Sequence, residues 1–324
     1  MRVLVASKID PDALATLKAE HDVDVAIGVT GDELADRMAD REALVFRSGV
    51  AIDEALLDRA ASLRLIVRAG SGLDNLDLAM VKARGIALHR IPGPGARAVA
   101  EMTFALFLAL ARQLRLADGL LREGHWAKND IVGWNLGGKT LGIVGLGSIG
   151  STVARLGRAW DMDVVGCVER PDPAREAAFA TEGIRLAPFH EVLAASDFVS
   201  VHVPLDASTR GLIGAPELVR MRPGSFLVNI ARGGIVDEDA LLAALRSGER
   251  PAGAALDVHV AEGEGKISPL AGLPNVILTP HIGATTVDAQ REIGAEIVRL
   301  VGTADRPEQS PAGTSADPGL EVRP

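Results

Sequence analysis

Short apolar runs alternate with helical stretches over the first ninety or so residues of the chain. The runs cover residues 2–7 (RVLVAS), 43–48 (ALVFRS), 64–69 (RLIVRA) and 86–91 (IALHRI). Between them lie stretches such as PDALATLKAE and IDEALLDRAAS, which have helical character. Strands that alternate with helices usually pair in parallel. The pattern therefore predicts a small α/β domain with a parallel sheet.

A second series of apolar runs begins at about residue 139. Its members are TLGIVG, DVVGCV, FVSVHV, SFLVNI, GAALDV and NVILTP, with helices predicted between several of them. One long helix from about residue 98 to 122 and an irregular connection join the two series. Its most apolar part, residues 102–111 (MTFALFLALA), is too short to span a bilayer.

The run GLGSIG at residues 145–150 follows a predicted strand and opens a predicted helix. A G-x-G-x-x-G triplet in this position is typical of the turn that holds the pyrophosphate of a dinucleotide. Gly145 permits the tight turn, Gly147 lets the backbone approach the pyrophosphate, and Gly150 lets the helix pack on the strand. The helix N–H groups then face the anion. This turn predicts a domain that binds NAD or NADP.

Composition narrows the class of protein. At 324 residues the chain is long enough for two domains that each bury a core. Aromatic residues make up only 3%, and the mixture of small aliphatic residues suits strands covered by helices on both faces. The net charge of −9, without a clustered basic stripe, argues against a nucleic-acid partner. Tyrosine is absent, which excludes the short-chain reductases that depend on a Tyr-x-x-x-Lys acid.

The single cysteine, Cys167, lies in the apolar run VVGCV and is predicted to be a buried strand thiol. Structural zinc would need several closely spaced thiols or imidazoles, so we expect no metal site. Met1 leads directly into a strand without a charged and then apolar leader, so we expect a cytoplasmic protein with no membrane partner.

Three polar residues each follow a predicted strand of the second series. Arg232 follows SFLVNIA, Glu262 comes shortly after Asp257 at the end of GAALDV, and His281 follows VILTP. Ligands of open α/β sheets bind at the carboxyl ends of the strands, so we expect the three to converge beside a nicotinamide. His281 would exchange a proton with the substrate oxygen, Glu262 would fix the imidazole tautomer, and Arg232 would bind a carboxylate.

Each of these residues also has a simpler interpretation when it is considered alone. A histidine after a strand is usually structural, an arginine is usually a surface charge, and GEGEGK resembles an ordinary acidic loop. Their shared position behind a dinucleotide turn favours the catalytic interpretation. The remaining histidines have no such set of partners and are predicted to be structural: His21, His89, His125, His190, His202 and His259.

Over about residues 40–300 the sequence resembles the D-2-hydroxyacid dehydrogenase family. The resemblance rests on an ordered series of stretches: RAGSGLDNLDLAMVKARGI, GARAVAEMTFALFLALAR, GKTLGIVGLGSIG, HVPLDASTRGLI, RPGSFLVNIARGGIVDEDAL, GAALDV and NVILTPHIGATT. It implies a doubly wound (Rossmann) nucleotide domain inserted in a smaller flavodoxin-like α/β substrate domain. We place the substrate domain at 1–98 and 285–302 and the nucleotide domain at 99–284. Residues 303–324 lack apolar periodicity and are predicted to be disordered.

The resemblance also assigns roles to residues. It implies that Arg232, Glu262 and His281 are catalytic and that Asp257 lies near the nicotinamide amide. We expect the substrate to be bound by Arg47, by the backbone around Ser71 and Gly72, and by Arg232. We expect the cofactor to be bound by Gly145, Gly147, Ser148, Ile149, Gly150, Glu169, Arg170, His202, Pro204, Ala231, Asp257, His281 and Gly283. Members are usually homodimers, to which residues around 98–138 contribute.

Within the family, the pair Arg47–Ser48 and the stretches RAGSGLDN and TPHIGATT are most similar to the short form of phosphoglycerate dehydrogenase. Arg47 would then meet a substrate phosphate, unless it is a surface arginine at a strand end. Two glycines depart from that pattern. Gly95 stands where the subgroup carries Asn, and Gly263 replaces the usual Pro after the catalytic Glu.

The stretch CVERP at 167–171 leaves the choice of cofactor open. Val168 occupies the position of the ribose-binding Asp in members that prefer NAD. Glu169 could accept hydrogen bonds from the ribose and keep NAD, which we favour, whereas Arg170 could pair with a 2′-phosphate and select NADP.

Three other functions remain open. One is an NADPH-dependent glyoxylate or hydroxypyruvate reductase, marked by Arg170, and a second is a cofactor-sensing protein like the corepressors that share this fold. Formate oxidation fits less well, because formate dehydrogenases of this superfamily carry Gln where Glu262 stands.

Overall fold

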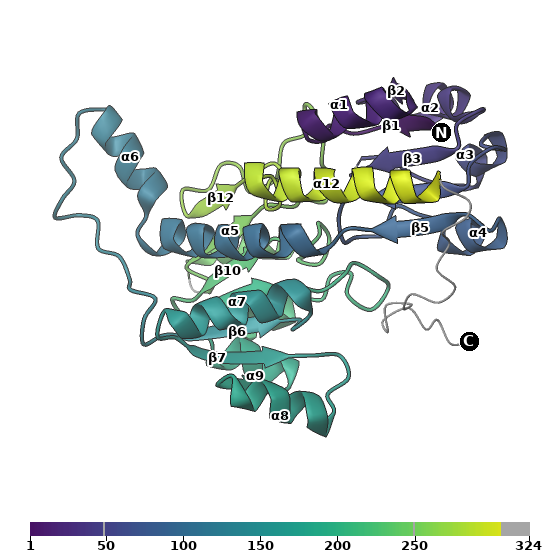
Figure 1. The fold of residues 1–324 in the computed structure, drawn as a ribbon. Coiled ribbons are helices and arrows are strands. Elements are labelled where there is room, and N and C mark those ends of the chain that lie inside the picture. Colours follow the sequence, from purple (N-terminus) through teal and green to yellow (C-terminus); the bar gives the residue numbers. More distant parts are fainter. Residues whose placement is uncertain (48, 249, 306–324) are drawn as a thin grey trace. The chain divides into compact units, whose positions relative to one another are not determined.

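A computed structural model describes residues 1–47, 49–248 and 250–305 and divides the chain into two compact α/β units (Figure 1). The first unit comprises Met1–Pro94 and the segment that begins at Val287, and the second comprises Gly95–Thr286. The chain thus leaves the first unit, forms the whole second unit and returns to the first.

The first unit contains a five-stranded parallel sheet in the order β2-β1-β3-β4-β5. This order is that of flavodoxin-like folds. Its elements are β1 (Arg2–Val5), α1 (Pro11–Glu20), β2 (Asp22–Val25), α2 (Gly31–Met38), β3 (Ala43–Phe46), α3 (Glu54–Arg59), β4 (Leu65–Arg68), α4 (Leu78–Ala83), β5 (Ala87–Arg90) and α12 (Val287–Ala304).

Helices cover both faces of this sheet because successive strand side chains point to opposite faces. Val3 and Val5 of β1 pack with residues of α1 and α12, whereas Leu4 packs with residues of α2, α3 and α4. The strands β1, β3 and β4 are therefore apolar at nearly every position, which is the pattern that made them visible in the sequence.

The second unit contains a seven-stranded parallel sheet in the order β12-β11-β10-β9-β6-β7-β8. Helix α5 begins at the boundary of the two units and continues into this one. The elements are α5 (Gly93–Ala111), α6 (Leu114–Arg122), β6 (Thr140–Val144), α7 (Ser148–Ala159), β7 (Asp163–Cys167), α8 (Pro173–Thr181), β8 (Ile184–Leu186), α9 (Phe189–Ala195), β9 (Phe198–Val201), α10 (Ala215–Arg220), β10 (Phe226–Asn229), α11 (Glu238–Ser247), β11 (Gly253–Leu256) and β12 (Val276–Leu278).

The direction of winding of the second sheet changes between β6 and β9, as in doubly wound nucleotide-binding folds. One face packs on α5 and α7, and the other packs on α9, α10 and α11. The glycine turn follows β6, so it lies at the point where the winding changes, which is where such sheets bind ligands. The predicted α/β class and doubly wound sheet are confirmed.

Several predicted elements need correction. The single helix expected over about 98–122 is two helices, because the backbone of Gln113 adopts a left-handed conformation with φ of 50° between α5 and α6. The Trp134 N–H caps α5 by donating to the Ala111 carbonyl at 2.9 Å. Residues 303 and 304 belong to α12 and Asp305 forms a turn, rather than a disordered tail, and the rest of that prediction, 306–324, lies outside the described residues.

Helix α5 is longer than its apolar stretch 102–111 suggested. Among the described residues, it is the one helix that is long and apolar enough, by length and composition alone, to cross a membrane. More than half of its apolar window, 56%, is buried inside the structure, as is usual for a core helix. The prediction for Cys167 is confirmed, since its thiol is free and buried at the end of β7, where burial raises its pKa.

Candidate active site

Three loops meet at the carboxyl ends of neighbouring strands in the second unit. The strands β10, β11 and β12 pair in parallel, with Leu227 opposite Ala254 and Ala254 opposite Val276. Arg232 lies on the loop after β10, Glu262 on the loop after β11, and His281 on the loop after β12. The sheet thus brings to one edge loops that are far apart in the sequence.

The side chains of His281 and Glu262 form a hydrogen-bonded pair. The distance from His281 Nδ1 to Glu262 Oε2 is 3.0 Å, and both side chains are partly exposed to solvent. Burial raises the pKa of Glu262, but the hydrogen bond and charge of His281, with smaller contributions from His259, lower it by more. The net result is a pKa below 4.5, so Glu262 is a carboxylate at neutral pH and accepts the Nδ1 proton.

The backbone at His281 is constrained by Asp257. His281 has φ of 54°, a left-handed conformation that few residues other than glycine adopt. The carboxylate of Asp257, which is 1% exposed, accepts hydrogen bonds from Thr279 Oγ1 at 2.6 Å, Ile282 N at 2.9 Å and Gly283 N at 2.8 Å. The His281 N–H donates to the Asp257 carbonyl at 2.7 Å. Asp257 therefore holds the turn that presents the imidazole.

Arg232 lies on a tightly folded turn directly after β10. Its carbonyl accepts a hydrogen bond from Asn229 Nδ2 at 2.9 Å, and Asn229 Oδ1 accepts one from Ala231 N at 3.2 Å. The guanidinium donates from Nη1 to the Ala231 carbonyl at 2.7 Å. The buried amide of Asn229 thus fixes the backbone at the root of the Arg232 side chain.

The glycine turn has one position that the fold itself does not explain. A Cβ at Gly145, where φ is +99°, would approach the His202 carbonyl oxygen to 2.6 Å, and a Cβ at Gly150 would overlap the Gly145 carbonyl. A Cβ at Gly147 would meet no heavy atom within 4 Å. Gly147 also precedes the first residue of α7, and no side chain caps this helix end. The turn therefore fits a dinucleotide pyrophosphate, which would use the open space at Gly147 and the N-terminus of α7, Ser148 and Ile149 included.

The residues after β7 form a small polar group beside this turn. Glu169 Oε1 and Arg170 Nη2 are 3.8 Å apart, and both side chains are exposed. Arg175 of α8, which the sequence analysis did not single out, donates from Nη2 to the carbonyl of Leu146 in the glycine turn at 3.4 Å. Carboxylate and guanidinium groups are thus both present where we expect the ribose of the cofactor to bind.

His202 and Pro204 follow β9 and lie below the glycine turn. His202 Nε2 is 2.7 Å from Ser200 Oγ, and burial lowers the pKa of His202 to about 3, so the ring is neutral. The Pro204 carbonyl accepts a hydrogen bond from Thr209 Oγ1 at 2.6 Å. The His202 carbonyl also lies against Gly145 of the glycine turn. The cofactor contacts predicted for His202 and Pro204 stay predictions.

Of the predicted substrate residues, Arg232 belongs to the second unit, and Arg47, Ser71 and Gly72 belong to the first. Arg47 follows β3, and its backbone N–H donates to Ser7 Oγ at 3.0 Å, while burial lowers the pKa of its side chain. Ser71 and Gly72 follow β4. Arg68, which is 7% exposed, donates from Nε to the Gly72 carbonyl at 3.0 Å and lies over the Phe46 ring. In the sequence, the run RLIVRA predicts only a strand and does not single out this buried arginine.

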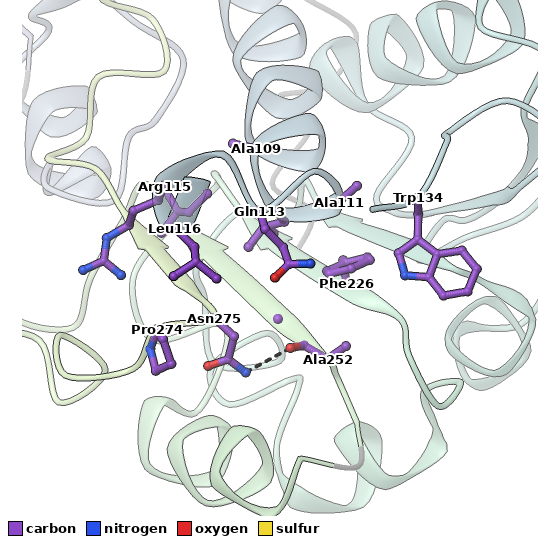
Figure 2. A pocket seen from close by; sticks show the side chains of 13 residues that line it. Ala109, Ala111, Gln113, Arg115, Leu116, Trp134, Phe226, Ala252, Pro274 and Asn275 are labelled. Atoms are coloured by element: carbon purple, nitrogen blue, oxygen red, sulfur yellow. Dashed lines mark hydrogen bonds between the residues drawn. The ribbon is translucent and has the colours of Figure 1, made fainter. Parts of the chain in front are cut away.

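A cavity of about 350 Å³ lies at the opposite edge of the second sheet (Figure 2). Phe226 is the first residue of β10, and Asn275 directly precedes β12, so these residues mark the amino ends of the strands. Arg115, Leu116 and Trp134 also line the cavity (Figure 2). The cavity is therefore separate from the loops that carry Arg232, Glu262 and His281. Across the described ranges, no group of three metal-ligating side chains is present.

Comparison with known proteins defines the class. Residues 104–283 match the model of the D-isomer specific 2-hydroxyacid dehydrogenase, NAD binding domain, and the chain belongs to this family. It is similar to D-3-phosphoglycerate dehydrogenase of Archaeoglobus fulgidus, with 40% identity over 91% of this chain and 55% of the relative. It is also similar to hydroxypyruvate reductase of Thermotoga maritima, with 38% identity over 93% of this chain and 97% of the relative.

A solved structure agrees with this assignment. The crystal structure of D-lactate dehydrogenase from Aquifex aeolicus complexed with NAD and lactic acid matches with a TM-score of 0.84 and 29% identity, over 94% of this chain and 95% of that chain. The chain spans little more than half the length of the phosphoglycerate dehydrogenases it matches, between 55% and 61% for the bacterial and archaeal relatives.

Proposed function

We propose that this chain is a dehydrogenase that transfers a hydride between NAD and C2 of a small D-2-hydroxy acid or 2-keto acid. The observation that carries the proposal is the 3.0 Å pair of His281 and Glu262 at the carboxyl end of a doubly wound sheet. The turn of the same unit has the open Gly147 position that a dinucleotide would use. Bound nicotinamide would supply or accept the hydride.

Side chains of this protein would transfer the proton of the substrate oxygen and bind the negative charge of the substrate carboxylate. Because Glu262 accepts the proton on Nδ1, His281 Nε2 is the nitrogen that exchanges a proton with the substrate oxygen. In reduction the imidazolium protonates the oxygen on C2 and becomes neutral, and in oxidation the neutral ring removes the hydroxyl proton. The Glu262 carboxylate stabilises the imidazolium. Arg232 would bind the substrate carboxylate through two parallel N–H donors and polarise the neighbouring carbonyl.

For the substrate, 3-phosphoglycerate is the first candidate. Arg47 supports it, because a desolvated guanidinium gains much from an anionic partner. Hydroxypyruvate or glyoxylate is the second candidate, and the observation that favours it is the similarity to a hydroxypyruvate reductase along 97% of that relative's length.

A panel of 2-keto and 2-hydroxy acids, assayed with both cofactors, tests this function. We expect turnover of at least one acid, with 3-phosphoglycerate or its keto acid oxidised or reduced most efficiently. Replacing Arg47 by Gln should raise KM for the phosphorylated substrate and leave KM for glyoxylate unchanged. A folded chain that binds cofactor but is inert toward every acid would instead support the cofactor-sensing function.

For the cofactor, we propose NAD. Glu169, exposed two residues after β7, supports NAD because its carboxylate can accept hydrogen bonds from both ribose hydroxyls and repels a 2′-phosphate. The measurement is the ratio of kcat/KM with NADH to that with NADPH. We expect the ratio to exceed one and to fall in a Glu169→Gln variant. A strong preference for NADPH would instead assign Arg170 or Arg175 to the 2′-phosphate.

For the assembly, we propose a homodimer that forms through α6 and the segment after it. Helix α6 has no buried residue, which is unusual for a helix with one apolar side. An exposed apolar patch of this kind marks an interaction surface, and the cavity between it and the amino ends of β10–β12 could receive side chains of a partner (Figure 2). The exposed apolar residues are Leu114, Leu116, Leu121, Trp126, Val132 and Trp134.

A further inference from the structure

We propose that His259 is a positioning residue that holds the three loops of the candidate active site in register, an inference that depends on the proposed function. In the sequence, His259 is one of the histidines predicted to be structural, and the structure gives it contacts with the candidate site that the sequence did not show. His259 lies on the loop after β11, between Asp257 and Glu262. Its contacts reach all three loops.

The first contact is with the loop that carries His281. His259 Nε2 is 3.0 Å from the carbonyl oxygen of Thr279, two residues before His281. A carbonyl can only accept, so Nε2 carries the hydrogen and the tautomer of His259 is fixed. The hydroxyl of the same Thr279 donates to Asp257. Thr279 is therefore bound at its carbonyl by one residue of the β11 loop and at its hydroxyl by another.

The second contact is with Glu262. The backbone N–H of His259 donates to Glu262 Oε1 at 3.2 Å, while Glu262 Oε2 accepts from His281 at 3.0 Å. Each oxygen of the carboxylate therefore has its own donor. If the peptide of His259 moves, the carboxylate loses one of the two bonds that orient it toward the imidazole of His281.

The third contact is with the loop that carries Arg232. A Cβ at Gly233 would overlap the carbonyl group of His259, so the peptide after Arg232 packs directly against the peptide of His259. On the other side, the buried carboxylate of Glu238 accepts a hydrogen bond from Val260 N at 2.7 Å. The backbone at 259–260 is thus clamped between the β10 loop and the start of α11.

The imidazole of His259 therefore ties the loop that carries Glu262 to the carbonyl of Thr279. Its other nitrogen, Nδ1, is buried without a hydrogen-bond partner among the described atoms. A buried polar atom without a partner carries a cost in free energy. A residue that serves only to fill space would avoid that cost, whereas one that must donate from Nε2 cannot.

Three substitutions separate positioning from packing. His259→Phe keeps the ring but removes the donor, His259→Gln places an amide N–H near the position of Nε2, and His259→Asn places it nearer to Nδ1. His190→Phe, on the exposed surface of α9, is the matched control. We expect Phe and Asn at position 259 to lower kcat by about 10- to 100-fold, because small misplacements of reacting groups cost rates of this order. Gln should restore most of the rate.

Substrate and cofactor binding, and the pH profile of kcat, distinguish a positioning role of His259 from a merely structural one. KM for the acid and the dissociation constant for NADH should stay near the wild-type values in all three variants, because the loop of Arg232 packs on the backbone of His259 and not on its imidazole. The acid limb of the pH profile of kcat should move to higher pH in the Phe and Asn variants, because Glu262 would lose part of the contact with His281 that lowers its pKa. The Gln variant should keep the wild-type limb.

The outcomes are distinct. If Phe, Asn and Gln variants all retain the wild-type kcat, or if all three lose it equally, the positioning role is wrong while the proposed function stands. If the Phe variant does not fold, the comparison of Gln with Asn decides in the same way. If the wild-type chain turns over no acid at all, the proposed function is wrong, and this inference fails with it.

Discussion

Glu262 is the residue whose ionisation controls the pairing with His281. Its pKa is lowered in the folded chain because the contact with His281 outweighs the effect of burial. A carboxyl group with a lowered folded pKa stabilises the fold above its unfolded pKa and loses this contribution as the pH falls through the folded pKa. The pair is therefore complete at neutral pH and is lost in acid.

Replacing Glu262 by Gln tests this balance. At pH 7 we expect a lower Tm than in the wild type, because the charge interaction with His281 is lost. The difference should shrink as the pH falls from about 4.5, the ordinary pKa of this group, through the lower pKa of the folded chain, where the wild-type carboxyl also becomes protonated. Thermal unfolding between pH 7 and pH 3 measures the effect, with Glu264→Gln on the same loop as the control. A difference in Tm that does not depend on pH would contradict the account.

Arg232 tests the binding of the substrate carboxylate. A lysine in its place keeps the positive charge but cannot form two parallel N–H bonds. We expect Arg232→Lys to raise KM for the acid and to lower kcat, with NADH affinity unchanged. Arg222→Lys, at the amino end of β10, is the matched control and should behave as the wild type. Unchanged KM and kcat in Arg232→Lys would count against the carboxylate role.

At the scale of the element, the six residues of the glycine turn include one glycine that the fold requires and one that we expect to serve cofactor binding. Gly150 faces the carbonyl of Gly145 at close range, so Gly150→Ala should lower Tm strongly or prevent folding. Gly147 faces open space with φ of −78°, so Gly147→Ala should keep the wild-type Tm but weaken NADH binding. Thermal unfolding and a fluorescence titration with NADH measure both effects. Wild-type affinity in a folded Gly147→Ala variant would show that the turn does not hold the dinucleotide.

The central strands that the sequence revealed and the two strands that it hid differ in burial. Central strands such as β3 and β4 are apolar on both faces and appear as continuous runs. The two strands that the apolar runs missed, β2 and β8, lie at sheet edges and carry polar residues, as in DVDV and IRL. An edge strand is paired on one side only, and its residues face solvent more often. The apolar runs alone therefore predict one strand too few in each of the two sheets.

The candidate site also contains features that are visible in the sequence and features that are not. Arg232, Glu262 and His281 could be found because their side-chain chemistry and their positions after strands are both visible in the sequence. The contact between His259 and Thr279 could not be found in this way, because it uses a backbone carbonyl, which every residue has. The break at Gln113 was hidden for a similar reason, since residues 132–134, far along the chain, supply the partners for the end of α5.

At the scale of the whole molecule, the exposed apolar residues of α6 predict the assembly. Leu121, which is 58% exposed, should lie in the dimer interface, so Leu121→Glu should yield a folded monomer. Val219→Glu on α10, at a similarly exposed apolar position, is the control and should remain dimeric. Sedimentation equilibrium gives the mass of each species. A wild-type chain that sediments as a monomer at micromolar concentration would contradict this assembly.

We expect the two units to have different roles in the proposed reaction. The first contains Arg47, Ser71 and Gly72, which we expect to select the acid, and the second contains the dinucleotide turn and the His281–Glu262 pair. Variants of the first unit should therefore change KM and substrate preference. Variants of the second should change turnover or cofactor binding.

The most direct test of the central claim follows deuterium from C4 of labelled NADH during reduction of the 2-keto acid panel. The account predicts a D-2-hydroxy acid labelled at C2, and a His281→Ala variant that still binds NADH but is slower by about 10²- to 10⁴-fold. A folded wild-type chain that binds NADH and transfers no label to any acid, or a His281→Ala variant with the wild-type rate, would contradict it.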